Sequence, residues 1–230
     1  MRIRAVSLDL DDTLWPIEPA IVAAEQALDE WLRAHHAPVA AAWPIAALRD
    51  LRERVSAEHP HLAHDFTAQR RLSLRAALEP HGYGDAELEA AFEAYYAARN
   101  EVDLYPDVRA GLERLAARVP LVSLSNGNAD LGRIGLAHLF AASVSARDFG
   151  RGKPDPAIFA HACERVGIAP GNVLHVGDDP ALDVAGARAA GLATAWVNRT
   201  DAAWSHDVEP DVTVKDLAEL ADWLDLRRAA

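Results

Sequence analysis

The first apolar run of the chain stops abruptly in a group of acids. Residues 5–8 form a short, mainly apolar stretch, as expected of a strand that is buried on both faces. Three carboxylates follow within four residues, at Asp9, Asp11 and Asp12, and Thr13 comes next. Aspartate is depleted in strands, and a buried carboxylate is costly unless it is paired or bound to metal. We therefore predict that this strand ends at a functional site, the alternative being a polar turn that only closes the strand.

Helical spacing of the apolar residues takes over after Trp15 and continues to about residue 99. Breaks rich in polar residues, glycine or proline fall at residues 59–65 and 80–84. Because no convincing strand occurs here, we predict that an all-helical subdomain is inserted directly after the first strand. The helices predicted within it cover residues 21–35, 44–55, 66–78 and 85–99.

From Tyr105 onward, strand and helix patterns alternate. This order predicts an α/β fold, a doubly wound parallel sheet with right-handed crossovers. We expect a Rossmann-like core at residues 1–16 and 102–230, and the helical insertion at residues 17–101. The predicted strands cover residues 119–125, 142–145, 173–176, 193–197 and 212–214, and the predicted helices cover residues 106–115, 129–136, 156–166, 180–190 and 217–224.

Composition narrows the class of protein. Of the 230 residues, 50% are hydrophobic and 25% are charged, which is typical of a soluble globular protein. The formal net charge of −12 would repel a nucleic-acid backbone. A single cysteine, Cys163, excludes an internal disulfide and fits a reducing compartment. Because Asp9 interrupts any signal-like apolar segment and no later run could span a membrane, we expect a cytoplasmic monomer or homodimer without nucleic-acid or membrane partners.

Three more polar clusters follow apolar runs farther along the chain. In an open parallel sheet, ligands bind outside the carboxyl ends of the strands. We therefore expect these clusters and the acids of the first strand to converge on one crevice. The three clusters are Ser-Asn-Gly-Asn at residues 125–128, Gly-Lys-Pro-Asp at residues 152–155, and Gly-Asp-Asp-Pro at residues 177–180 with Asp183 beyond.

The charges of these clusters predict a bound metal ion. Two like charges 4 Å apart repel by about 4 kcal/mol at an effective dielectric of 20, and Lys153 alone cannot offset several such pairs. A divalent cation can, and a set of oxygen ligands without a nearby cysteine or histidine favours Mg²⁺ over zinc. Without the metal, one of the acids should be protonated instead. The acids concerned are Asp9, Asp11, Asp178 and Asp183.

Taken together, the clusters resemble the four motifs of the haloacid dehalogenase-like (HAD) hydrolase superfamily. Their order and spacing agree over nearly the whole chain, and four ordered motifs are far more specific than any one of them. The helical insertion resembles the cap domain of subfamily I members. The matching residues are 9–13, 125–127, 152–154, and 177–179 with Asp183.

The resemblance implies a Mg²⁺-dependent phosphatase that acts on a small phosphate ester. Asp9 would be the nucleophile that forms an aspartyl-phosphate. Asp11 would protonate the leaving oxygen and later deprotonate the attacking water. Lys153 would assist catalysis, Thr13 would fix the turn, and Asp12 is given no role.

The same resemblance assigns the binding residues. The transferring phosphoryl group would be held by Ser125, Asn126, Lys153 and the backbone at Leu10. Mg²⁺ would be bound by the Asp9 carboxylate, the Asp11 carbonyl and Asp178, with Asp183 closing the site directly or through water.

Asp11 bears on the reaction type, because true haloacid dehalogenases resemble this fold but lack that second acid. Its presence favours hydrolysis of a phosphate ester, with a phosphomutase or a dehalogenase as the alternatives. Among phosphatases, the chain is most similar to bacterial enzymes acting on flavin mononucleotide and a ribityl-aminouracil phosphate. That similarity lies in core residues such as 175–179 and 191–196, whereas nucleotide and sugar phosphatases share the same core.

The residues that select the substrate are expected in the helical insertion or next to it. Trp15 could stack on a ring of the substrate, or pack as a hinge residue. Arg70 and Arg71 could meet substrate charge, or belong to a solvated helix face. A histidine cluster could bind a metal or form a polar loop, at His59, His61 and His64.

Overall fold

The structure is a computed structural model that describes residues 2–229. Its internal contacts divide the chain into two compact units. The core unit comprises the chain up to Pro16, Asp103–Gly127, and the residues from Gly135 onward. The helical unit comprises Ile17–Val102 and Asn128–Ile134. These units are groups of residues in mutual contact and do not test the predicted domain limits, which therefore stay a prediction.

The core unit is built on a six-stranded sheet in the order β3-β2-β1-β4-β5-β6. All five neighbouring pairs are parallel, which confirms the predicted fold class. Four of the strands, β1, β2, β4 and β5, are buried along their whole length, as their apolar runs predict. The strands are β1 (Ala5–Leu8), β2 (Leu121–Ser125), β3 (Ala142–Ser145), β4 (Val173–Gly177), β5 (Ala193–Val197) and β6 (Val212–Val214).

The strand order reverses at β1, because the chain first builds outward through β2 and β3 and then returns to place β4 on the other side. In β1 and β4, Leu8 pairs with Val176, so both strands end at the same edge of the sheet. Such a reversal leaves a crevice outside the carboxyl ends of the strands. The acids that follow β1 and β4 therefore lie at the edge where this fold binds ligands.

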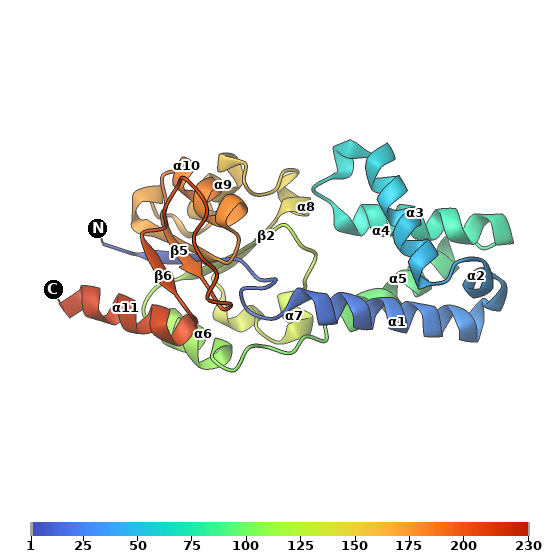
Figure 1. Cartoon of the computed structure of the whole chain (residues 1–230), viewed down its shortest axis with the longest axis horizontal. Helices are drawn as coiled ribbons and strands as arrows, with labels where there is room; N and C mark the ends of the chain where they lie inside the picture. Colours follow the sequence, from blue (N-terminus) through green and yellow to red (C-terminus); the bar gives the residue numbers. More distant parts are fainter. Residues whose placement is uncertain (1, 230) are drawn as a thin grey trace. The chain divides into compact units, whose positions relative to one another are not determined.

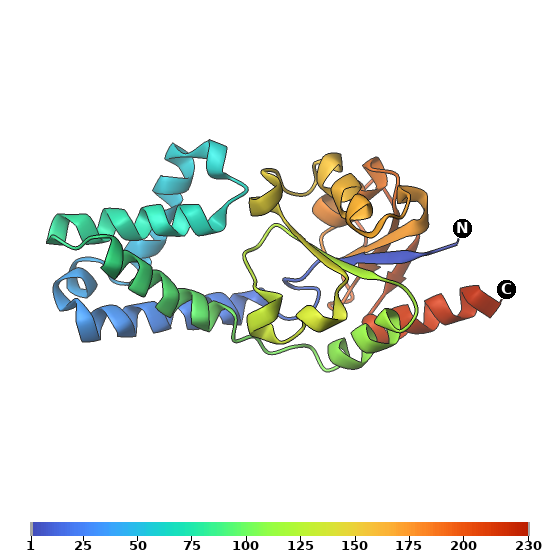
Figure 2. The ribbon, with the colours of Figure 1, turned by 180° about the vertical axis from the view of Figure 1, so that it is seen from behind.

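Helices cover both faces of the sheet. Figures 1 and 2 show α9 and α10 on one face, and α6 and α11 on the other. The helical elements of this unit are α6 (Val108–Ala116), η3 (Ala137–Leu139), α8 (Ala146–Phe149), α9 (Pro156–Val166), η4 (Pro170–Asn172), η5 (Pro180–Ala185), α10 (Gly186–Ala189) and α11 (Leu217–Ala229).

Helix α9 shows how local sequence signals set an element and its buried face. Asp155 caps its N-terminus by accepting a hydrogen bond from the Ala157 amide, and Gly167 ends it with a φ of 66°. Ile158, Phe159, Ala162 and Cys163 form its buried face. Burial raises the pKa of the Cys163 thiol to about 11, so this cysteine is an inert core residue.

The helical unit packs around its own apolar cluster, which includes Leu28, Leu74, Leu88 and Phe92. No described helix, here or in the core unit, is long and apolar enough to cross a membrane. The helical elements of this unit are α1 (Ile17–His35), α2 (Ala37–Ala42), α3 (Ile45–Glu58), η1 (Pro60–Leu62), α4 (Phe66–Leu78), η2 (Glu79–His81), α5 (Asp85–Arg99) and α7 (Leu131–Ile134).

Two predicted helices differ from the structure, and an observed helix is not predicted. The helix expected over residues 129–136 is reduced to α7, because Gly135 adopts a φ of 82° and ends it. The short helix α2 is not predicted, since its six residues carry too little periodicity. The helix expected over residues 180–190 begins as a π-helix, η5, and only then continues as α10. Such π segments are frequent at functional sites.

Replacing Gly111 by alanine tests the contact between α6 and α11. A Cβ on Gly111 would lie 2.5 Å from the Leu217 Cβ. Alanine gains about 1 kcal/mol in helix propensity, whereas overpacking costs about 1–3 kcal/mol. We expect Gly111→Ala to lower the free energy of unfolding, measured by urea denaturation. Gly171→Ala is the control, because nothing lies within 4 Å of its added Cβ. Equal or greater stability of Gly111→Ala would show that the helices do not pack this closely.

Candidate active site

The chain turns sharply as soon as β1 ends. The Asp9 amide donates to the Val176 carbonyl at 2.9 Å, which holds Asp9 at the strand end beside β4. Asp12 then adopts a left-handed φ of 59°, a conformation that aspartate tolerates better than most residues. Its amide donates to the Trp15 carbonyl at 2.8 Å. This closed turn leaves Asp9 as the first residue after the strand and places Asp11 on the loop beyond it.

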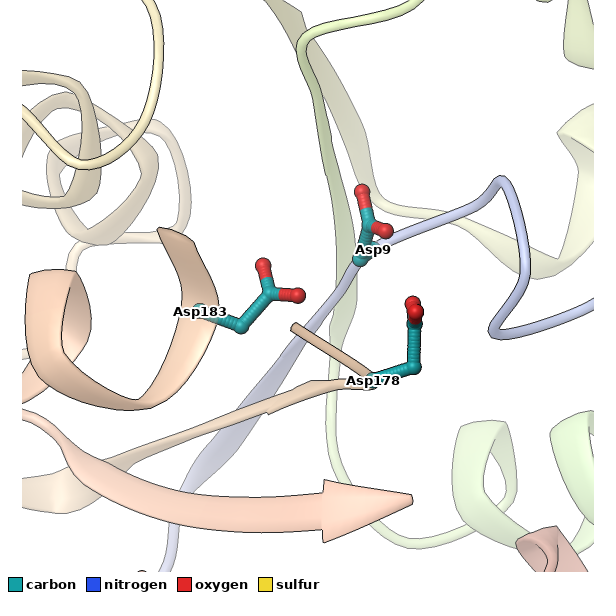
Figure 3. A group of neighbouring side chains, drawn as sticks. All are labelled: Asp9, Asp178 and Asp183. Carbon is teal, nitrogen blue, oxygen red and sulfur yellow. The ribbon is translucent and has the colours of Figure 1, made fainter. Parts of the chain in front are cut away.

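Three carboxylates meet at this edge of the sheet. Figure 3 shows Asp9 at the end of β1, Asp178 just after β4 and Asp183 on η5. One oxygen of each lies within 4.8 Å of the others. Asp183 is 1% exposed and Asp9 is 8% exposed. A dense, buried set of oxygen donors fits a hard divalent cation, so these three residues could hold a metal ion.

Lys153 lies between two of the carboxylates. Its Nζ donates to Asp9 Oδ1 at 2.5 Å and to Asp183 Oδ1 at 2.6 Å. Burial alone would lower the pKa of Lys153, but Asp183 and Asp9 hold that pKa above its ordinary value. Lys153 is therefore a permanently charged group within the cluster.

The charge of the cluster is unevenly shared. Burial favours a higher pKa for Asp183, yet Lys153 and His175 hold that pKa below its usual range. Burial raises the pKa of Asp9 well above normal, although Lys153 opposes this. Burial and the Asp183 charge raise the pKa of Asp178 to about 7. The expectation that one acid is protonated in the absence of metal agrees with these directions.

His175 supports Asp183 from within the sheet. Its Nε2 lies 3.0 Å from Asp183 Oδ1, and its Nδ1 lies 2.5 Å from the hydroxyl of Ser7. Burial lowers its pKa, although Asp183 acts to raise it. A neutral imidazole satisfies both contacts, with Nε2–H donating to Asp183 and Nδ1 accepting from Ser7. The sequence analysis predicted that no histidine lies near the acids, and His175 shows that this prediction is wrong. The signal in the sequence was that His175 is the one polar side chain within the apolar run of β4.

Asp178 is fixed by the loop that follows β1. The Thr13 hydroxyl donates to Asp178 Oδ1 at 2.8 Å, and the Trp196 indole donates to its carbonyl at 2.7 Å. The predicted role of Thr13 in fixing the turn thus extends to orienting an acid of the site. Arg199 braces the same loop, because its guanidinium donates to the Thr13 carbonyl at 2.9 Å and pairs with Asp107. Arg199 lies in none of the predicted motifs, and Trp196 enters the sequence analysis only as the last residue of the similar run 191–196, without a role.

The Ser-Asn-Gly cluster closes the site from β2. Ser125 ends the strand with 5% exposure, and its Oγ accepts from the Gly127 amide at 2.9 Å. The side chain of Asn126 accepts from the Lys153 amide at 2.7 Å and donates to the Lys153 carbonyl at 2.9 Å. Asn126 therefore holds the backbone that carries Lys153. Its predicted contact with phosphate through its own backbone, like that of Leu10, stays a prediction.

Two glycines allow acids to approach the backbone. A Cβ on Gly127 would lie 2.3 Å from Asp11 Oδ2, and a Cβ on Gly177 would lie 2.2 Å from Asp183 Cγ. Any side chain at these positions would displace a carboxylate. The glycines of the second and fourth motifs thus leave the space that Asp11 and Asp183 occupy.

Asp11 is held apart from the three clustered carboxylates. The Trp15 indole donates to Asp11 Oδ1 at 2.9 Å, and Trp15 is completely buried. Its ring has no exposed face, so the predicted stacking of Trp15 on a substrate is corrected to a hydrogen bond that orients Asp11. The Asp11 carboxylate is not a member of the clustered group, so its predicted metal contact rests on its carbonyl alone.

The predicted specificity residues of the helical unit differ from one another. Arg70 is 4% exposed, and its guanidinium lies 4.0 Å from the centre of the Tyr95 ring, so it is not on a solvated face. Arg71 is partly exposed and pairs with Glu89 at 2.7 Å. The histidines of the predicted cluster do not form a metal-binding group, because the three aspartates are the only such group among residues 2–229. Those histidines are His59, His61 and His64.

Replacing Lys153 by methionine should destabilise the metal-free protein. The substitution leaves two buried carboxylates without their cation, which costs about 3–5 kcal/mol. Urea denaturation with a chelator present measures the loss. Lys215→Met is the matched control, because Lys215 is largely exposed and contacts Asp201 only at 3.5 Å. Its effect should stay within about 0.5 kcal/mol. Similar denaturation midpoints for the two variants would contradict a supporting role for Lys153.

Comparisons with known proteins agree with this geometry. A family model described as haloacid dehalogenase-like hydrolase matches residues 3–191. The chain is 30% identical to the 5-amino-6-(5-phospho-D-ribitylamino)uracil phosphatase of Escherichia coli (strain K12), over 95% of both proteins. It is 38% identical to a phosphoserine phosphatase of Thermus thermophilus over 64% of this chain and 61% of that protein.

A solved structure is also similar. The crystal structure of a 2-haloacid dehalogenase from Pseudomonas syringae pv. Tomato DC3000 has a TM-score of 0.90 and 41% sequence identity. The aligned region covers 99% of this chain and 100% of the dehalogenase chain. The sequence motifs, the six-stranded sheet and the family match all lead to one assignment. This chain belongs to the haloacid dehalogenase-like hydrolases, as its motifs predict.

Proposed function

We propose that this protein is a Mg²⁺-dependent phosphatase that hydrolyses small phosphate monoesters through an aspartyl-phosphate on Asp9. The observation that carries the proposal is the presence of two separately held acids. Asp9 lies against Lys153, whereas Asp11 is oriented by Trp15 and lies against Gly127. Hydrolysis of an alkyl ester needs a nucleophile and a proton donor for the leaving oxygen.

The chemistry follows from these positions. The Lys153 bond occupies Asp9 Oδ1 and leaves Oδ2 to attack phosphorus, while the bond from phosphorus to the ester oxygen breaks. Asp11 gives its proton to the departing alkoxide. Asp11 then takes a proton from a water molecule that attacks phosphorus, the bond to Asp9 breaks, and phosphate is released. Ser125 and Lys153 hold the phosphoryl oxygens during both steps.

The residues present fit Mg²⁺. Asp9, Asp178 and Asp183 supply only oxygen donors, and Lys153 neutralises one charge of the three. Some negative charge is left over, and it adds to burial, the larger cause, in raising the pKa values of Asp9 and Asp178. When bound, Mg²⁺ would neutralise this charge and that of the phosphoryl group. We propose these three residues and the Asp11 carbonyl as its protein ligands, Asp183 acting directly or through water.

A phosphorylated metabolite is the proposed substrate, and the Escherichia coli relative makes a ribityl-aminouracil phosphate or flavin mononucleotide a reasonable first choice. A second candidate function is dehalogenation of a 2-haloacid, because the Pseudomonas syringae structure with that title is 41% identical to this chain. A halide leaving group needs no proton, so the oriented Asp11 favours the phosphatase. Assays of phosphate release from esters and of halide release from 2-haloacids separate the two.

The variants Asp9→Asn and Asp11→Asn test the two roles. Asp9→Asn should abolish phosphate release from every ester, because the nucleophile is lost. Asp11→Asn should reduce kcat by about 10²–10⁴-fold with a sugar phosphate and much less with p-nitrophenyl phosphate, whose leaving group needs no proton. Asp12→Asn is the control in the same turn, since asparagine also tolerates a positive φ. Equal losses on both esters in Asp11→Asn would exclude the acid role.

Magnesium binding should weaken as the pH falls below 7. Asp178, with a pKa of about 7, must lose its proton before it can bind the ion. The affinity should be about tenfold lower at pH 6 than at pH 8, measured by calorimetry.

The same pKa predicts how stability without metal depends on pH. The folded protein holds a proton on Asp178 that the unfolded chain loses near pH 4, so this group makes the metal-free protein less stable as the pH rises from about 4 to 7. Added Mg²⁺ should oppose the loss. Asp178→Asn is the control that removes both effects. Affinity independent of pH in the native protein would contradict this account.

A further inference from the structure

Arg199, in the segment 198–211 that follows β5, holds the loop that carries the first motif. Its Nη2 and Nε donate to the Thr13 carbonyl at 2.9 Å and 3.2 Å. The amide of Tyr105 donates to the next carbonyl of the loop, that of Leu14, at 3.0 Å. The guanidinium lies 3.9 Å from the centre of the Tyr105 ring, so Arg199 and Tyr105 also hold each other. Two successive carbonyls of the loop are therefore fixed by one pair of residues.

Arg199 is itself held in place by Asp107. Its Nη1 and Nη2 donate to the two carboxylate oxygens of Asp107 at 2.9 Å and 3.0 Å, and the two side chains are only 14% and 13% exposed. Asp107 Oδ2 also accepts from the Leu217 amide at 2.9 Å, at the start of α11. Burial acts to raise the pKa of Asp107, but Arg199 and the Leu217 amide hold that pKa below its ordinary value. The pair therefore stays ionised, and it is anchored to the start of α11.

The same loop supplies the hydrogen bond that orients Asp178, one of the three carboxylates in Figure 3. Thr13 is completely buried, and its hydroxyl donates to Asp178 Oδ1 at 2.8 Å. The hydroxyl can direct this oxygen only while the Thr13 backbone keeps its place. Arg199 secures that backbone through the carbonyl of the same residue. The contacts form one chain within the core unit, from the ion pair through Thr13 to Asp178.

We propose that Arg199 is a positioning residue of the metal site, and that it sets the affinity and selectivity for Mg²⁺ by holding Asp178 through Thr13. This inference rests on the proposed function, in which Asp178 is a ligand of Mg²⁺. Residues that hold a ligand in place contribute about 10- to 100-fold to metal affinity. Mg²⁺ demands nearly octahedral geometry at short distances, whereas Ca²⁺ accepts a variable arrangement of oxygens. A loosened Asp178 should therefore weaken the binding of Mg²⁺ more than that of Ca²⁺.

Calorimetry of both ions with the native protein and Arg199→Gln tests the proposal. Glutamine cannot form the two-pronged pair, so we expect Arg199→Gln to bind Mg²⁺ about tenfold more weakly and Ca²⁺ less than about twofold more weakly. Arg188→Gln is the matched control, because Arg188 holds the same segment through Asp211 and the Glu209 carbonyl instead. It should leave both affinities unchanged. Equal losses for the two ions in Arg199→Gln, or no loss, would make Arg199 a structural residue only and overturn the proposal.

A double-mutant cycle tests the route through Thr13. Thr13→Val removes the hydroxyl that holds Asp178 and keeps a branched side chain. If Arg199 acts through Thr13, the double variant should bind Mg²⁺ no more than about twofold more weakly than the weaker of the two single variants. Losses that multiply in the double variant would show that Arg199 acts independently of Thr13, against the proposal.

Folding of each variant is measured separately, by circular dichroism and urea denaturation with a chelator present. Arg199→Lys keeps the charge beside Asp107, but a single ammonium replaces the planar fork, so it should bind Mg²⁺ about fivefold more weakly. Should Arg199→Gln not fold, Arg199→Lys decides in its place. Native affinities for both ions in Arg199→Lys would then refute the positioning role.

The two proposals fail in different ways. If no ester releases phosphate while Arg199→Gln still loses affinity for Mg²⁺ selectively, the phosphatase proposal is wrong and the role of Arg199 stands. If phosphate is released with Mg²⁺ and Arg199→Gln binds both ions as the native protein does, the role of Arg199 is wrong and the phosphatase proposal stands. A native protein that takes up no Mg²⁺ would refute both.

Discussion

One buried cation, the ammonium of Lys153, connects the parts of the site. It donates to Asp9 at the end of β1 and to Asp183 on η5, which are far apart in the sequence. In a region shielded from water these attractions are stronger than at the surface, and each partner maintains the charge of the other. This one cation faces three carboxylates, and burial together with the remaining carboxylate charge raises the pKa values of Asp9 and Asp178. The site is therefore built to take up more positive charge.

The positions of the acids and of Lys153 depend on neighbouring residues that hold them in place by hydrogen bonds. Asn126 clamps the Lys153 backbone on both sides, and His175 fixes Asp183 from inside the sheet. Trp15 fixes Asp11, and Thr13 fixes Asp178. Each contact is a hydrogen bond in a buried or partly buried position, where it is stronger than at the surface. Because one core hosts both phosphatases and dehalogenases, such details decide the reaction more than the fold does.

Much of the fold can be predicted from the sequence because its signals are local. The apolar runs at residues 121–125, 173–177 and 193–197 are strands, and the polar clusters behind them lie at one edge of a parallel sheet. That geometry is nearly forced once strands and helices alternate, since crossover connections make neighbouring strands parallel. Helix limits are predicted less well in the same sequence. The helix expected over residues 129–136 ends before Gly135, whose positive φ the sequence pattern did not reveal.

The sequence by itself determined the α/β class, the helical insertion, and the acids and lysine that gather at the sheet edge, because periodicity and chain order encode them directly. Tertiary structure alone decided how those groups are held and charged. The bond from Trp15 to Asp11, the support of Asp183 by His175, and the burial of Arg70 against Tyr95 all depend on how side chains pack in three dimensions. No local pattern specifies such contacts, since whether a polar group is buried and paired depends on neighbours that folding alone brings together.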